Sequence, residues 1–95
     1  MFGRITRFQG DPSRMAEMES RIPAIKDQVS KIEGGIANYA MWNEDGSGVA
    51  VAIYPDEATA NAAQAHIQKI WGGLADLLTA APEITSYSKA ERMRG

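Results

Sequence analysis

Hydrophobic and polar residues follow two different periods along this chain, and each change of period marks a new element. Residues 1–9, 36–43, 49–54 and 83–92 alternate between two faces, which is typical of β-strands. Residues 15–32 and 56–80 place apolar side chains at three- and four-residue steps, as amphipathic helices do. This order predicts an α+β fold of the ferredoxin-like βαββαβ type, in a single domain over residues 1–95. A four-stranded antiparallel sheet then carries two helices on one of its faces.

Proline, glycine and aspartate mark where the predicted helices begin and end. Pro23 lies inside the first helical pattern, where it removes a backbone donor and either kinks the helix or divides it. Gly34-Gly35 ends that helix, and Glu44–Gly48 predicts a hairpin loop between the second and third strands. Asp56 is expected to cap the second helix, in which Gly72-Gly73 predicts a break.

Neither face of the second or third predicted strand carries a charged residue. In the third strand, Val49, Val51 and Ile53 alternate with alanines and Tyr54, and the second strand is equally free of charge. A lone sheet covered by helices on one side would carry polar residues on the other. The pattern therefore predicts a homodimer formed through the sheet face. The alternative is a monomer with a mildly apolar exposed face.

Composition excludes several kinds of partner. The net charge is −2 and the pI is near 5.3, which argues against a surface for nucleic acid or an anionic membrane. No stretch approaches the roughly 18 apolar residues of a membrane span, and the first ten residues do not resemble a signal peptide. Since there is no cysteine, disulfides and thiolate metal sites are excluded, and a reducing cytoplasm is the expected location.

The turns of this chain resemble those of a known superfamily. Gly34-Gly35-Ile36 leads into the second strand, an acidic, glycine-containing hairpin follows, and the third strand runs into Pro55-Asp56-Glu57-Ala58. In this layout the chain resembles the dimeric α+β barrel superfamily, and within it the antibiotic biosynthesis monooxygenase-like group. The resemblance implies two ferredoxin-like sheets paired into a barrel, with the helices outside. It also implies a small pocket between sheet and helices in each subunit.

Active members of that superfamily are cofactor-free oxygenases of aromatic polyketides, quinol oxygenases or haem-degrading enzymes. The haem-degrading branch uses an asparagine on strand one, and a tryptophan followed by a histidine on helix two. Here strand one has no asparagine, and His66 precedes Trp71. The resemblance therefore implies a protein that uses no haem and no other cofactor.

His66, Asn38 and Tyr39 are the candidate catalytic residues. His66 is the only histidine, and an imidazole near a substrate could take up a phenolic proton at neutral pH. The alternative is a partly exposed helix residue beside the apolar stripe. Asn38 and Tyr39 could orient a substrate through hydrogen bonds. The ordinary explanation for Asn38 is an edge strand, on which polar residues meet water.

Trp42, Trp71, Tyr54 and Arg4 are the candidates for binding a substrate. The two tryptophans could form walls for a flat aromatic molecule, although burial alone, or a dimer interface for Trp42, would also explain them. Tyr54 ends the third strand, where members of the superfamily often place an aromatic residue. Arg4 or its neighbour Arg7 could hold a ligand carboxylate. The alternative is an ion pair across the dimer, for example with Glu91.

Other chemistries can be set aside. One histidine without cysteines makes no metal site, and the glycine pairs follow helices where a phosphate-binding loop would precede one. Small aliphatic residues in the third strand argue against an RNA-recognition domain. Two functions remain, a cofactor-free monooxygenase-like enzyme for a small aromatic or apolar molecule, and a non-catalytic ligand-binding or regulatory module. A barrel that serves dimerisation alone is the third hypothesis.

Overall fold

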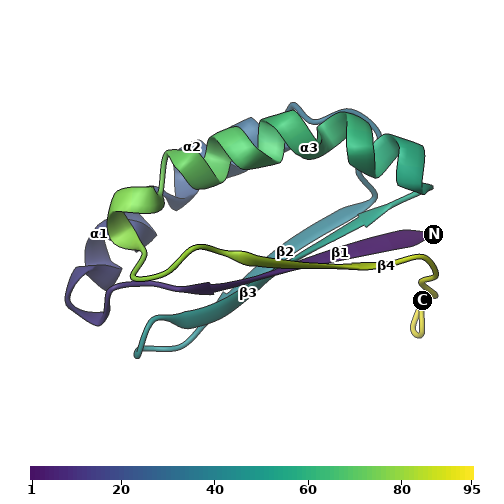
Figure 1. Ribbon diagram of the computed structural model, residues 1–95. Coiled ribbons are helices and arrows are strands. Elements are labelled where there is room, and N and C mark those ends of the chain that lie inside the picture. The colour runs from purple at the N-terminus through teal and green to yellow at the C-terminus, as the bar shows by residue number, and fades with distance from the viewer.

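The computed structural model describes residues 1–95 as one antiparallel sheet with all helices on one face (Figure 1). The strands are β1 (Phe2–Gln9), β2 (Ala37–Trp42), β3 (Ser47–Tyr54) and β4 (Glu83–Tyr87), in the spatial order β2-β3-β1-β4. This is the ferredoxin-like order that the sequence predicts, with β1 and β3 central and β2 at an edge. The α+β fold class is therefore confirmed.

The first helical segment is divided in two near Pro23, which is one of the two outcomes predicted from sequence. A 3-10 turn at Pro12–Arg14 leads into α1 (Met15–Ser20), and α2 (Ile22–Ser30) begins with Pro23 in its first turn. A proline in a first turn costs little, because the backbone N–H it lacks would have no partner in the helix. α2 ends at Ser30, before the glycine pair predicted to end it, and Gly34 adopts a left-handed φ of 81° in the turn that follows.

The second helix is α3 (Glu57–Gly72), and both its cap at Asp56 and the predicted break at Gly72-Gly73 are confirmed, whereas the helical pattern predicted up to Ala80 is not. Asp56 accepts a hydrogen bond from the Thr59 backbone N–H at 2.7 Å, which satisfies one of the free donors of the first turn. The helix ends at the glycine pair, and a short 3-10 turn follows at Ala75–Leu77. No helix of the chain is long and apolar enough to cross a bilayer.

Strand β4 is shorter than the sequence predicts. It ends at Tyr87, and residues 88–92 do not continue it to Arg92. The neighbouring strand β1 explains why β4 ends there. Tyr87 pairs with Gly3 of β1, so only two residues of β1's chain remain beyond that point. A strand cannot extend past the neighbour that accepts its hydrogen bonds, and Glu91 makes no ion pair within the subunit.

The register sorts the strand residues into two faces. Arg4 pairs with Ala52, which also pairs with Asn38, so these three form one row across the sheet. Thr6, Ala50 and Ala40 form the next row. Both rows lie on the helix side. On the other face, which we call the open face, lie the side chains of Ile5, Arg7, Gln9, Ala37, Tyr39, Met41, Ser47, Val49, Val51, Ile53, Glu83, Thr85 and Tyr87.

The buried core between sheet and helices is small and divided. One cluster contains Phe2, Tyr54, Ala60 and Ala63, and the other contains Met18, Leu74 and Leu77. Only 11 of 95 residues are buried, so neither cluster fills the layer between helices and sheet. The rows that contain Arg4 and Thr6 lie between the two clusters, and this is where the chain leaves space.

Candidate binding cavity

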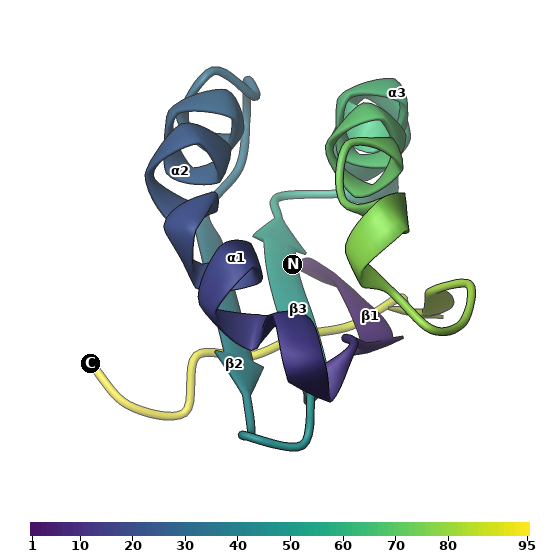
Figure 2. The same ribbon diagram turned by 90° about the vertical axis from the view of Figure 1, so that its left-hand side faces the viewer.

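A cavity of about 520 Å³ lies on the helix side of the sheet, between α2 and α3. Figure 2 shows the two helices side by side above the strands, and the cavity's walls come from their facing sides. Most of its lining is hydrophobic. The residues that line it are Arg4, Thr6, Phe8, Met18, Ile22, Ile25, Lys26, Val29, Ser30, Asn38, Tyr39, Ala40, Trp42, Ala50, Val51, Ala52, Tyr54, Ile67, Ile70, Trp71, Leu74 and Ile84.

Alanines on β2 and β3 give the cavity its depth. Ala52 lies between Arg4 and Asn38, and Ala50 lies between Thr6 and Ala40. Neighbouring strands are about 4.8 Å apart, so the residues that flank each alanine stand roughly 10 Å from one another. A methyl group fills little of that width. The small side chains therefore leave room for a ring between the flanking residues.

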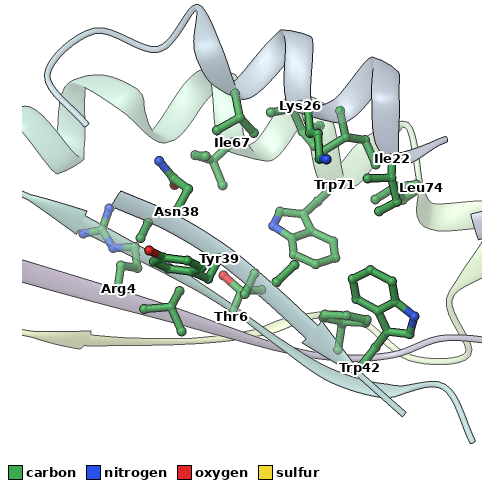
Figure 3. A pocket seen from close by; sticks show the side chains of 18 of the residues that line it. Arg4, Thr6, Ile22, Lys26, Asn38, Tyr39, Trp42, Ile67, Trp71 and Leu74 are labelled. Carbon is green, nitrogen blue, oxygen red and sulfur yellow. The ribbon is translucent and has the colours of Figure 1, made fainter. Parts of the chain in front are cut away.

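Aromatic residues close one end of the cavity. The rings of Trp71 and Phe8 lie 5.3 Å apart at an angle of 48°. Phe8 in turn covers Gly48, where an added Cβ would stand 2.3 Å from the Phe8 ring. Trp42 completes this end, and its indole N–H donates to Glu19 of α1 at 3.1 Å. Figure 3 shows both indoles at the end of the cavity away from Arg4 and Asn38.

Arg4 is the charged group at the opposite end. Its guanidinium donates to Ser86 Oγ at 3.0 Å, Gln64 Oε1 at 2.9 Å, Asn61 Oδ1 at 3.3 Å and the Ala60 carbonyl at 3.3 Å. These acceptors are all neutral, and no carboxylate pairs with Arg4 in the subunit. Four bonds use four of the five N–H donors of an arginine. The site therefore holds a positioned positive charge and one donor without an acceptor.

Hydroxyl groups add to this polar end. Thr6 is 5% exposed and Tyr54 is 2% exposed, and neither hydroxyl makes a hydrogen bond within the subunit. Since no fully buried polar side-chain atom lacks a partner, both hydroxyls must reach open space. Burial raises the pKa of the Tyr54 hydroxyl, and the charge of Arg4 opposes this in part. Tyr54 therefore stays protonated at neutral pH and can donate a hydrogen bond.

The structure brings together five of the seven candidate residues. Arg4, Asn38, Tyr54, Trp42 and Trp71 all line the cavity with side chains on its helix side. Trp42 thus faces the cavity, so its ring cannot contribute to an interface on the open face. Tyr39 borders the cavity too, but the register places its side chain on the open face, and the residue is 68% exposed.

His66 is not among the lining residues. It is exposed on α3, one position before Ile67, whose side chain does reach the cavity. No other histidine exists in the chain, so the cavity contains no imidazole from this subunit. The catalytic role of His66 therefore stays a prediction from sequence.

Three polar lining residues, Thr6, Lys26 and Ser30, are not among the candidates from sequence. Lys26 follows Ile22 by four residues and so lies on the same face of α2. That spacing is the signal that could have identified it.

The fold recurs in several solved structures. An antibiotic biosynthesis monooxygenase superimposes with a TM-score of 0.78 at 12% identity, over 96% of this chain and all of the other. The chain has the same fold as that protein. SnoaB, a cofactor-independent oxygenase from Streptomyces nogalater, shares this fold with a TM-score of 0.74, at 19% identity over 99% of this chain and 97% of SnoaB. A conserved protein from Methanosarcina mazei Go1 matches with a TM-score of 0.79 at 18% identity, over 94% and 92% of the two chains.

The resemblance suggested by the turns is thus confirmed at the level of the monooxygenase fold. No protein-family model and no curated protein matches the sequence. At identities of 12–19%, the likeness shows the fold alone. The chemistry of this chain has to be argued from its own cavity.

Proposed function

We propose that the cavity binds a small, flat, mostly apolar molecule that carries an aromatic hydroxyl group, and that the protein promotes its oxygenation without a cofactor. The observation that carries the proposal is the combination of apolar walls with one arginine that lacks a carboxylate partner. Apolar walls suit an aromatic ring. A lone cation at the end of such a cavity favours a ligand oxygen that is negative or becomes negative.

Arg4 would act by stabilising the ionised form of the substrate hydroxyl. An opposite charge within a few ångströms lowers the pKa of a hydroxyl, so more of the bound substrate is present as the electron-rich anion. Tyr54, whose hydroxyl is close enough to Arg4 for that charge to affect its pKa, can donate a further hydrogen bond to the same oxygen. Asn38 lies across Ala52 from Arg4 and can contact the opposite edge of the molecule. The aromatic end would hold the ring and exclude water. No imidazole is needed for this step.

The reaction that fits is the conversion of a ring CH₂ group to a carbonyl by O₂, as in an anthrone. One oxygen atom becomes the carbonyl oxygen. The other leaves as water with the two hydrogens of that carbon. The substrate supplies all four electrons, so no reductant or metal enters the balance.

Titration with 1,8-dihydroxyanthrone tests this proposal, because both tryptophans of the chain line the cavity. We expect saturable quenching of tryptophan fluorescence, and oxygen uptake faster than in a protein-free solution. Absence of quenching up to the solubility limit would refute the proposal. Quenching without oxygen uptake would favour the second function, a non-catalytic ligand-binding module. The absence of a base from the cavity is the observation in favour of that alternative.

We also propose that a second copy of the chain covers the open face. Tyr39 is 68% exposed, Met41 58% and Tyr87 45%. The aliphatic residues Ile5, Val49, Val51 and Ile53 lie between them on the central strands. Contiguous exposed apolar residues of this kind commonly mark a protein–protein contact. Pairing of two such faces would bury these residues and form the barrel.

Met41→Glu is expected to shift this protein from dimer to monomer. The residue is exposed in the subunit, so the subunit's own fold should tolerate the charge, whereas burial of an unpaired carboxylate in the interface costs several kcal/mol. Sedimentation velocity at micromolar concentration measures the effect. Gln28→Glu on the outer side of α2 makes the same charge change and should leave the dimer intact. A wild-type protein that sediments at 10.3 kDa would refute the dimer.

A further inference from the structure

The charged residues around the cavity are all of one sign. Arg4 and Lys26 line it, and no aspartate or glutamate does, although the chain has 12 acidic residues and a net charge of −2. Glu19 contacts a lining residue, because its carboxylate accepts from the Trp42 indole at the aromatic end. The cavity of an acidic protein is therefore positive, most of all away from Trp42.

Lys26 is a second cation without a carboxylate partner. It lies on α2, on the face shared with Ile22 and Ser30, and Figure 3 shows its side chain extending from the helix towards the cavity. Its neighbour Asp27 pairs instead with Lys31, at 3.0 Å on the outer side of the helix. The acid closest in sequence is thus directed away, and Lys26 remains free to meet a ligand.

We infer that the cavity's ligand carries a carboxylate in addition to its aromatic hydroxyl, and that Lys26 is the residue that selects for it. This inference rests on the proposed function, because it takes the hydroxyl to be at Arg4. Arg4 on the sheet and Lys26 on α2 are two separate cations. They match a molecule with two separate acidic groups. Lys26 is exposed in the subunit, so a neutral ligand gains nothing from it, whereas a carboxylate would accept a charge-assisted hydrogen bond from its ammonium.

Calorimetric titration with a matched pair of probes tests the inference. The probes are 6-hydroxy-2-naphthoic acid and its methyl ester, which share the ring and the hydroxyl and differ in charge. Wild-type protein at pH 7 is expected to bind the acid about tenfold more tightly than the ester, the effect of one charge-assisted hydrogen bond. Lys26→Gln should remove this preference and leave the affinity for the ester unchanged. Lys69→Gln, an exposed lysine on α3 outside the cavity, should keep the preference.

The possible outcomes separate the inference from the proposed function. Equal binding of acid and ester by the wild type would overturn the inference and leave the aromatic site standing. The same holds if Lys26→Gln weakens both probes alike, which would indicate a structural role, or if only Arg4→Gln removes the preference for the acid. If neither probe binds, both the inference and the proposed function fail. A preference that is lost in Lys26→Gln alone supports the inference.

Discussion

Arg4→Gln is expected to raise the dissociation constant of a phenolic ligand by roughly 10- to 150-fold. A hydrogen bond to a charged group contributes about 1.5–3 kcal/mol, and each 1.4 kcal/mol is a factor of about ten in affinity. Glutamine can keep some contact with Ser86 or Gln64 but carries no charge. Calorimetry with 1,8-dihydroxyanthrone measures the affinity, and thermal unfolding shows whether the fold has been weakened.

The pH profile distinguishes an electrostatic role of Arg4 from a merely structural one. A cation beside the bound hydroxyl lowers its pKa, so removal of the cation raises it. Oxygen uptake by Arg4→Gln should therefore begin at a higher pH than in the wild type, while Arg4→Lys should restore much of the original profile. A loss of rate with no displacement along the pH axis would contradict the proposed role.

Arg7→Gln is the matched control for charge. Arg7 lies on the same strand as Arg4 but on the open face, where its guanidinium donates to Thr85 at 3.3 Å. We expect ligand affinity within about twofold of the wild type, provided that the variant still sediments as the wild type does. An Arg7 effect as large as that of Arg4 would mean that net charge alone explains the loss.

Most of the fold could be predicted because its signals are local. Asp56 caps its helix through a residue three positions away, and the glycine pairs act within their own turns. The end of β4 could not be predicted in this way. The end of β4 depends on where β1 begins, more than 80 residues earlier in the chain. The alternation of residues near position 90 does not indicate where β1 begins.

The candidate site was predictable in part for the same reason. Alternation along β2 puts Asn38 and Trp42 on one face, but neither face of that strand is charged, so the sequence did not say which face meets the helices. Helical spacing placed His66 beside the apolar stripe, and the structure leaves it outside the cavity. The sequence does not identify Lys26 as a cavity residue, because a lysine on a helix usually points to water. Only the three-dimensional structure shows that the side of α2 with Lys26 is the side that lines the cavity.

Ala50→Leu is expected to abolish ligand binding without harm to the fold. Ala50 lies on the cavity floor between Thr6 and Ala40, so a leucine side chain there would occupy the space proposed for the ring. Overlap with ligand atoms costs up to about 3 kcal/mol, which is about a hundredfold in affinity. In an empty cavity the same side chain gains contacts, so the melting temperature should stay level or rise by a few degrees.

Ala65→Leu, at an exposed position of α3, makes the same change in size and should leave binding unaltered. Differential scanning calorimetry and titration with 1,8-dihydroxyanthrone measure the two properties of both variants side by side. Wild-type affinity in Ala50→Leu would place the ligand elsewhere on the molecule. A melting temperature lower by about 8 °C or more, the effect of 1–2 kcal/mol in a domain of this size, would mean that the layer around Ala50 is already filled. The cavity is a binding site only if the protein tolerates the leucine and the ligand does not.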